Sequence, residues 1–141
     1  MDLTLFLGKK TPPLLFLGGT TAETGWRDEL IPILEKEKIE YFNPVVKNWN
    51  EKAIRREYQI KNNENTVELY VITKEMDGVF SIAEVVDASN KKPEKTIFMV
   101  IKDGFDESKL KSLNAVQELV EKNGAYIAEN FSDIISKVKA L

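Results

Sequence analysis

The sequence contains no histidine and no cysteine among its 141 residues. Ser-His-Asp and Cys-His catalysis, histidine general-base chemistry and standard zinc sites are therefore excluded. Disulfide bonds are excluded too, so cysteine usage says nothing about the redox compartment. If the chain is an enzyme, its chemistry depends on carboxylates, hydroxyls, amides or lysines.

The chain also lacks a basic excess and a long apolar run. Its formal net charge is -3 and its lysines are scattered, so we expect no nucleic-acid polymer as partner. The early apolar run at residues 3–7 is too short for a signal sequence and follows Asp2, so we expect no membrane partner and a cytoplasmic protein. The 43% hydrophobic and 30% charged residues are ordinary for one globular domain of this length.

Short apolar segments alternate with segments of helical periodicity, which predicts a parallel sheet with helices on both faces. The rhythm favours a flavodoxin-like, doubly wound, five-stranded α/β domain over residues 14–141 with strand order 2-1-3-4-5. Residues 1–13 form an arm or an extra edge strand in this interpretation, although the repeated Leu-Phe-Leu-Gly at 5–8 and 15–18 is equally compatible with coincidence. The expected strands are Leu14–Leu17, Glu40–Phe42, Val67–Thr73, Thr96–Ile101 and Ala125–Ile127, and the expected helices begin near Thr24, Glu51, Ser81, Glu107 and Ser132.

The segment Gly78–Asp87 places Glu84 in the first turn of a helix that follows a buried strand and a glycine turn. Ligands of open parallel sheets bind at this end of the strands. The helix dipole favours the charged form of a carboxylate there. An alternative stays open, because Ser81-Ile82-Ala83-Glu84 fits the S-x-x-E capping box, in which the glutamate only ties down the helix start.

The predicted topology brings further polar groups to the same end of the sheet. Gly18-Gly19 has neither G-x-G-x-x-G nor G-K-[ST] around it, so it indicates a tight turn or a close approach of backbone to ligand. Asn48 and Trp49 offer an amide and an indole, or form an ordinary loop with a buried tryptophan. The candidates from these loops are Gly18, Gly19, Thr20, Asn48, Asp77, Ser81 and Glu84.

Glu57 is a second unusual acid, because it falls within the apolar side of the helix expected at 51–62. Such an acid needs a partner, and Arg55 or Arg56 is available for a structural ion pair. A functional role is the alternative, because Glu57 and Glu84 together offer the two carboxylates suited to chemistry at a sugar C1'. The apolar residues around Glu57 are Ala53, Ile54, Tyr58 and Ile60.

Over residues 14–102 the order and spacing of several segments resemble the nucleoside 2-deoxyribosyltransferase-like proteins. The resemblance implies a flavodoxin-like fold and a retaining double displacement without metal or cofactor. Glu84 then attacks C1' of a 2'-deoxynucleoside, and a second base or water intercepts the covalent intermediate. The matching segments are Phe16-Leu17-Gly18-Gly19, Trp26-Arg27-Asp28-Glu29-Leu30-Ile31, Tyr41-Phe42-Asn43-Pro44, Leu69-Tyr70-Val71-Ile72-Thr73 and Gly78-Val79-Phe80-Ser81-Ile82-Ala83-Glu84.

The resemblance also implies roles for other residues. Glu57 falls near the acid that handles the departing base, and Asn48 where an amide contacts the nucleobase. Asp77 or Glu75 matches a further acid before the nucleophile. Ser81 is placed to contact the 5' end of the sugar, where relatives that hydrolyse nucleoside 5'-monophosphates bind phosphate.

One position departs from the family pattern. Phe16 stands where the transferases usually have a tyrosine whose hydroxyl touches the nucleophile. Either another donor, such as Tyr58 or Tyr70, replaces it, or transferase activity is weak or absent. Phe16, Gly18 and Gly19 are expected to line the substrate site.

The resemblance further implies a homo-oligomer acting on a small nucleoside or nucleotide. Two alternatives stay open: an N-glycosidase that cleaves a nucleoside, a nucleotide or NAD, and a catalytically silent nucleotide-binding module. The sequence leaves the base, the 2' preference and the need for a 5'-phosphate undecided.

Overall fold

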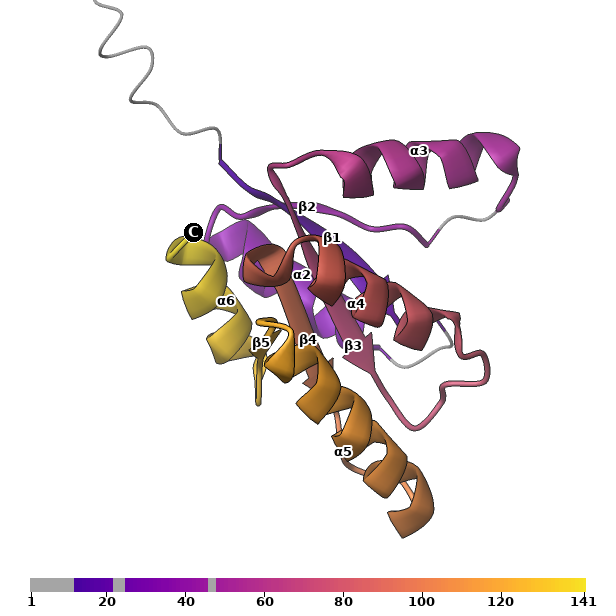
Figure 1. Ribbon diagram of the computed structural model, residues 1–141. Helices are drawn as coiled ribbons and strands as arrows, with labels where there is room; N and C mark the ends of the chain where they lie inside the picture. Colours follow the sequence, from indigo (N-terminus) through magenta and orange to yellow (C-terminus); the bar gives the residue numbers. More distant parts are fainter. Residues whose placement is uncertain (1–11, 22–24, 46–47) are drawn as a thin grey trace, which may run out of the picture.

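The computed structural model describes residues 12–21, 25–45 and 48–141. Its centre is a five-stranded, all-parallel sheet in the order β2-β1-β3-β4-β5, with helices on both faces (Figure 1). The predicted α/β single domain and its strand order are thus confirmed. The strands are β1 (Leu14–Gly19), β2 (Glu40–Phe42), β3 (Thr66–Ile72), β4 (Thr96–Val100) and β5 (Tyr126–Ile127), and the helices are α2 (Trp26–Lys36), α3 (Glu51–Asn62), α4 (Phe80–Lys91), the short 3₁₀ helix η1 (Pro93–Lys95), α5 (Glu107–Lys122) and α6 (Phe131–Lys139).

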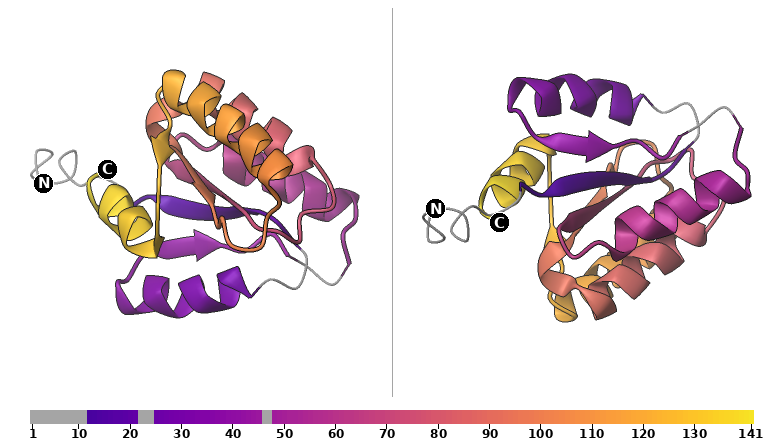
Figure 2. Two further views of the ribbon diagram at one scale, coloured as in Figure 1. Left: turned by 90° about the horizontal axis from the view of Figure 1, so that it is seen from below. Right: turned by 90° about the horizontal axis from the view of Figure 1, so that it is seen from above.

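Each face of the sheet has its own hydrophobic core. Helices α2 and α6 cover one face, and α3, α4 and α5 lie on the other (Figure 2). Every residue of β3 is buried, as a central parallel strand requires. The first core contains Leu17, Trp26, Leu30, Leu69 and Ile134, and the second contains Phe16, Tyr70, Val85, Phe98 and Leu113.

The boundaries of several elements differ from the predicted ones. Strand β1 continues through Gly18 and Gly19, which were expected to form a loop. Gly25, with φ 74°, precedes α2 without a side-chain cap; Thr24 lies outside the described residues. In α5, Leu113 and Val120 are buried, whereas Leu119 is 47% exposed.

The strand order fixes where a ligand site is expected. The chain crosses from β1 to one neighbour, β2, and then back to the other, β3. Loops that leave the carboxyl ends of these strands therefore diverge and leave a crevice between them.

The predicted arm at residues 1–13 falls almost entirely on residues outside the described part and stays a prediction. Within the described ranges, no helix is both long enough and apolar enough to cross a membrane.

Candidate functional site

A cavity of about 550 Å³ opens at the carboxyl ends of β1 and β3. Its walls come from the end of β1, the loop before α4, the first turns of α4 and one side of α3. Asn48, by contrast, does not line it and is exposed, whereas the neighbouring Trp49 does. Seven of the eight site residues expected from the sequence line this cavity: Phe16, Gly18, Gly19, Glu57, Asp77, Ser81 and Glu84.

Glu84 does not cap its helix. Helix α4 begins at Phe80, so Glu84 is its fifth residue and lies beyond the first turn. Val79 accepts the first helical hydrogen bonds and occupies the cap position without a side-chain bond. Because Ser81 lies inside the helix, its hydroxyl is not at the N-cap, so both the first-turn placement and the capping box were wrong.

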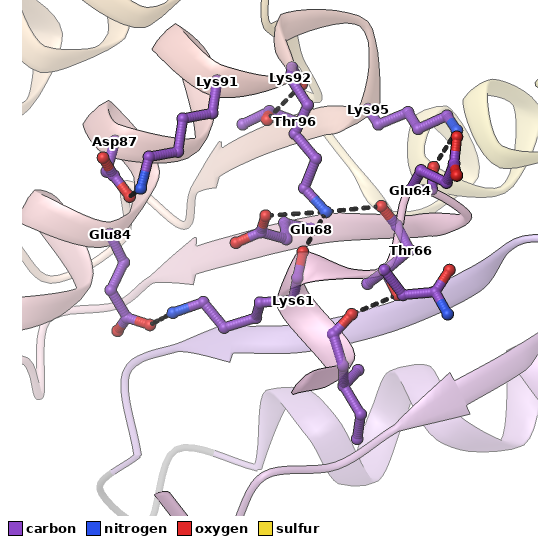
Figure 3. A network of polar contacts seen from close by, with 12 residues as sticks. Lys61, Glu64, Thr66, Glu68, Glu84, Asp87, Lys91, Lys92, Lys95 and Thr96 are labelled. Carbon is purple, nitrogen blue, oxygen red and sulfur yellow. Dashed lines mark hydrogen bonds and ion pairs between the residues drawn. The ribbon is translucent and has the colours of Figure 1, made fainter. Parts of the chain in front are cut away.

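The carboxylate of Glu84 is held by an ammonium group from another helix. Nζ of Lys61, at the end of α3, donates to Oε2 of Glu84 over 2.6 Å (Figure 3). The two side chains are only 17% and 14% exposed. The same ammonium lies 5.6 Å from the ring centroid of Phe16 and 5.8 Å from that of Tyr58. Sequence reasoning missed Lys61, although its spacing four residues after Glu57 on a helix was a signal.

Glu57 has an indole partner instead of an arginine. Nε1 of Trp49 donates to Oε1 of Glu57 over 3.3 Å. Arg56 lies over the ring of Phe42 instead, 5.5 Å from its centroid. In the part of the chain that the structure describes, no ion pair joins Glu57 to either neighbouring arginine, so the predicted structural pair was wrong.

Burial, one hydrogen bond and two neighbouring charges act on the pKa of Glu57. Burial raises the pKa of Glu57, the bond from Trp49 lowers it, the charge of Glu84 raises it and Lys61 lowers it. The net effect is a pKa above the ordinary value for glutamate. Glu57 is thereby suited to hold a proton more readily than an ordinary glutamate does.

Neither tyrosine replaces the hydroxyl that Phe16 lacks. The hydroxyl of Tyr70 donates to Oε1 of buried Glu68 over 2.5 Å. Burial first, and then the charge of Glu68, raises the pKa of Tyr70 far above its ordinary value, so this hydroxyl remains protonated. Tyr58 is 57% exposed and contacts Lys61 through its ring. The donor that reaches Glu84 is Lys61.

The two glycines of β1 are required by close packing. A Cβ on Gly19, whose φ is 113°, would lie 2.0 Å from the main-chain oxygen of Val71. A Cβ on Gly18 would lie 2.6 Å from the ring of Tyr70. The glycines therefore let β1 approach β3 and leave backbone beside the cavity; they form no tight turn, and their predicted approach to a ligand stays a prediction.

Arg27 closes the end of β1 from the side of α2. Its Nε and Nη2 donate to the main-chain oxygen of Leu17 over 3.1 Å and 2.9 Å, and its Nη1 donates to that of Thr20 over 2.6 Å. Burial lowers the pKa of Arg27 to about 10. This clamp fixes the cavity wall, and sequence reasoning missed it because the arginine's acceptors are backbone groups ten and seven residues away.

The acids of the loop before α4 both line the cavity. Glu75 accepts a hydrogen bond from the hydroxyl of Thr73 over 2.9 Å, whereas Asp77 is exposed. Ser81 is half-buried at the same wall. Within the described ranges, no group of acidic side chains is arranged to hold a metal ion.

The fold and the cavity define a flavodoxin-like α/β protein with an acidic site at the switch point of its sheet. Residues 12–104 match the family described as nucleoside 2-deoxyribosyltransferase like, and this match covers more than half of the chain. The chain belongs to this family, as the resemblance predicted. No curated protein and no solved structure gives a significant match.

Proposed function

We propose that this protein cleaves the N-glycosidic bond of a 2'-deoxynucleoside or its 5'-phosphate and transfers the sugar to another base. Glu84 is the nucleophile and Glu57 the acid that handles the departing base. One observation carries the proposal: two carboxyl groups in different electrostatic surroundings line one cavity. Pairs of acids with separated ionisation are how enzymes assign a nucleophile and a proton donor.

The first half-reaction forms an ester. A carboxylate oxygen of Glu84 bonds to C1' of the sugar while the bond between C1' and the base nitrogen breaks. The electron pair of the broken bond goes to the base, which takes a proton from the carboxyl group of Glu57. The base leaves neutral, and Glu57 becomes a carboxylate.

The second half-reaction reverses these roles. A nitrogen of the acceptor base attacks C1', the ester bond breaks, and its electron pair returns to Glu84. The proton of the acceptor goes to the carboxylate of Glu57. In the ester Glu84 has no charge, so one of the influences that raise the pKa of Glu57 is absent, and Glu57 stays ready to accept that proton.

The remaining wall residues bind and orient the substrate in this proposal. The ring of Phe16 and the indole of Trp49 offer apolar surface to the sugar and the base. The hydroxyl of Ser81 can donate to a sugar oxygen or to a 5'-phosphate near the start of α4, and the carboxylate of Asp77 can accept from the sugar hydroxyls. The predicted contact of Asn48 with the nucleobase is not part of this proposal, because Asn48 does not line the cavity.

Hydrolysis is the second candidate, with water in place of the acceptor base. It is favoured by the exposure of the cavity rim, where Trp49 is 63% and Phe80 is 65% exposed. An open mouth lets water reach the ester. The exposed rim is also compatible with the homo-oligomer that we expect, in which a second subunit covers it.

The test is an exchange assay on purine and pyrimidine 2'-deoxynucleosides and their 5'-phosphates, with and without an acceptor base. New nucleoside supports transfer, and free base without acceptor supports hydrolysis. We expect Glu84→Gln to lose activity and to form no covalent sugar adduct by intact mass, whereas the exposed control Glu94→Gln keeps both. Full activity in Glu84→Gln would refute the nucleophile. Thermal stabilisation by a nucleotide without turnover would instead identify a silent binding module.

A further inference from the structure

We propose that Lys61 is the positioning residue of the nucleophile: its ammonium fixes one carboxylate oxygen of Glu84 and leaves the other free to attack. This inference rests on the function proposed above. Nζ of Lys61 bonds Oε2 of Glu84 over 2.6 Å. Among the described residues, Lys61 alone makes a hydrogen bond or ion pair to this carboxylate.

The two members of the pair border different spaces. Glu84 lines the cavity proposed to hold the substrate, whereas Lys61 does not and instead borders a separate surface hollow between the end of α3 and α4. The ammonium thus contacts the carboxylate from a position that is not part of the cavity lining. Lys61 therefore acts on the reaction through Glu84 and is not itself a catalytic residue.

The main chain at Lys61 is held by hydrogen bonds of its own. Nζ of Lys92 donates to the main-chain oxygens of Lys61 and Thr66, over 2.7 Å and 2.9 Å, and pairs with buried Glu68 over 3.0 Å (Figure 3). The hydroxyl of Thr66 donates to the main-chain oxygen of Ile60 over 2.6 Å. These contacts attach the last turn of α3 to β3 and to the end of α4. The main chain from which the Lys61 side chain extends is therefore held in place.

The ring of Phe16 helps to hold the ammonium of Lys61 beside Glu84. The ammonium lies 5.6 Å from its centroid, where the negative face of an aromatic ring attracts a cation. Phe16 is buried and has no polar atom to offer Glu84. The ring can therefore attract the ammonium but cannot itself hold the carboxylate.

The experiment compares the steady-state kinetics of the wild type, Lys61→Met and Lys61→Arg. Lys61→Met should lower kcat by about 10- to 100-fold through a misplaced nucleophile, with KM changed by less than about threefold. Lys61→Arg keeps the charge and should lose less of the kcat. Lys91→Met is the control, because Lys91 pairs with Asp87 on exposed surface of α4.

An unchanged kcat in folded Lys61→Met overturns the proposal, and so does a loss confined to KM. Should Lys61→Met fail to fold, Lys61→Gln replaces it, and equal kcat in Lys61→Gln and Lys61→Arg overturns the role of the charge.

A second readout needs no activity. In nitrogen-15 spectra, the ammonium signal of Lys61 should be protected from exchange in the wild type and lose this protection in Glu84→Gln. An unprotected signal in the wild type overturns the proposal. A wild type that is inactive on every donor overturns the proposed function instead, and the protected signal then still reports the contact.

Discussion

The indole of Trp49 donates a hydrogen bond to the carboxyl group of Glu57, with 3.3 Å between Nε1 and Oε1. This bond favours the charged form and so lowers the pKa of Glu57, against the burial that raises it. Trp49→Phe keeps an aromatic ring over the acid but removes the donor. The pKa of Glu57 should therefore rise.

The pH dependence of kcat/KM measures this change. A protonated Glu57 is needed for departure of the base, so the alkaline limb of the profile should move to higher pH in Trp49→Phe. Glu57→Gln should remove that limb altogether. An unchanged limb in Trp49→Phe would show that another group controls the profile.

The raised pKa of Glu57 also predicts how stability depends on pH. A carboxyl group whose pKa is higher in the folded state favours folding when protonated, and this contribution is lost as the pH rises through the folded-state pKa. Glu57→Gln should therefore stabilise the protein at pH 7, by well under about 1 kcal/mol because the group is partly solvated. The gain should vanish below the ordinary pKa of glutamate. Urea unfolding at both pH values measures it, and a gain that grows on acidification would contradict the sign.

Lys92 should contribute far more to the free energy of unfolding than Lys91, the preceding residue. Its ammonium is mostly buried and compensates Glu68, whose side chain is 6% exposed. Lys92→Met leaves that carboxylate uncompensated, which should cost about 3–5 kcal/mol. Lys91→Met, which breaks an exposed pair with Asp87, should leave the free energy of unfolding nearly unchanged. Denaturant unfolding of both variants tests this, and equal effects would contradict the buried network.

Gly19 should tolerate no side chain. Gly19→Ala puts a Cβ 2.0 Å from a carbonyl oxygen of β3 at a φ of 113°, so we expect a loss of at least about 3 kcal/mol or no folded protein. Gly78→Ala is the matched control at the same cavity, because nothing lies within 4 Å of the added Cβ. Its unfolding free energy should stay within about 0.5 kcal/mol of the wild type. A destabilised Gly78→Ala together with an unaffected Gly19→Ala would contradict the tight packing at Gly19 and the open space at Gly78.

The sequence determined the fold because its information is local and periodic. The buried run of β3, the two helices at Glu51–Asn62 and Glu107–Lys122 and the short connections are enough to specify a doubly wound sheet, and this in turn places loop residues at one end of β1 and β3. The absence of histidine and cysteine likewise excluded the catalytic mechanisms and zinc sites that depend on them. Glu84, Glu57 and the cavity glycines were all found in this way.

The partners of those residues were decided only by the tertiary structure. The pattern around Glu84 fits a capping box, yet the helix begins one residue before Ser81, and the carboxylate instead meets Lys61, 23 residues away along the chain. Glu57 likewise bonds Trp49 and not an adjacent arginine. Spacing along a chain specifies which face of an element a side chain occupies, but which charge it meets depends on how two elements pack, and packing is set by contacts distant in sequence.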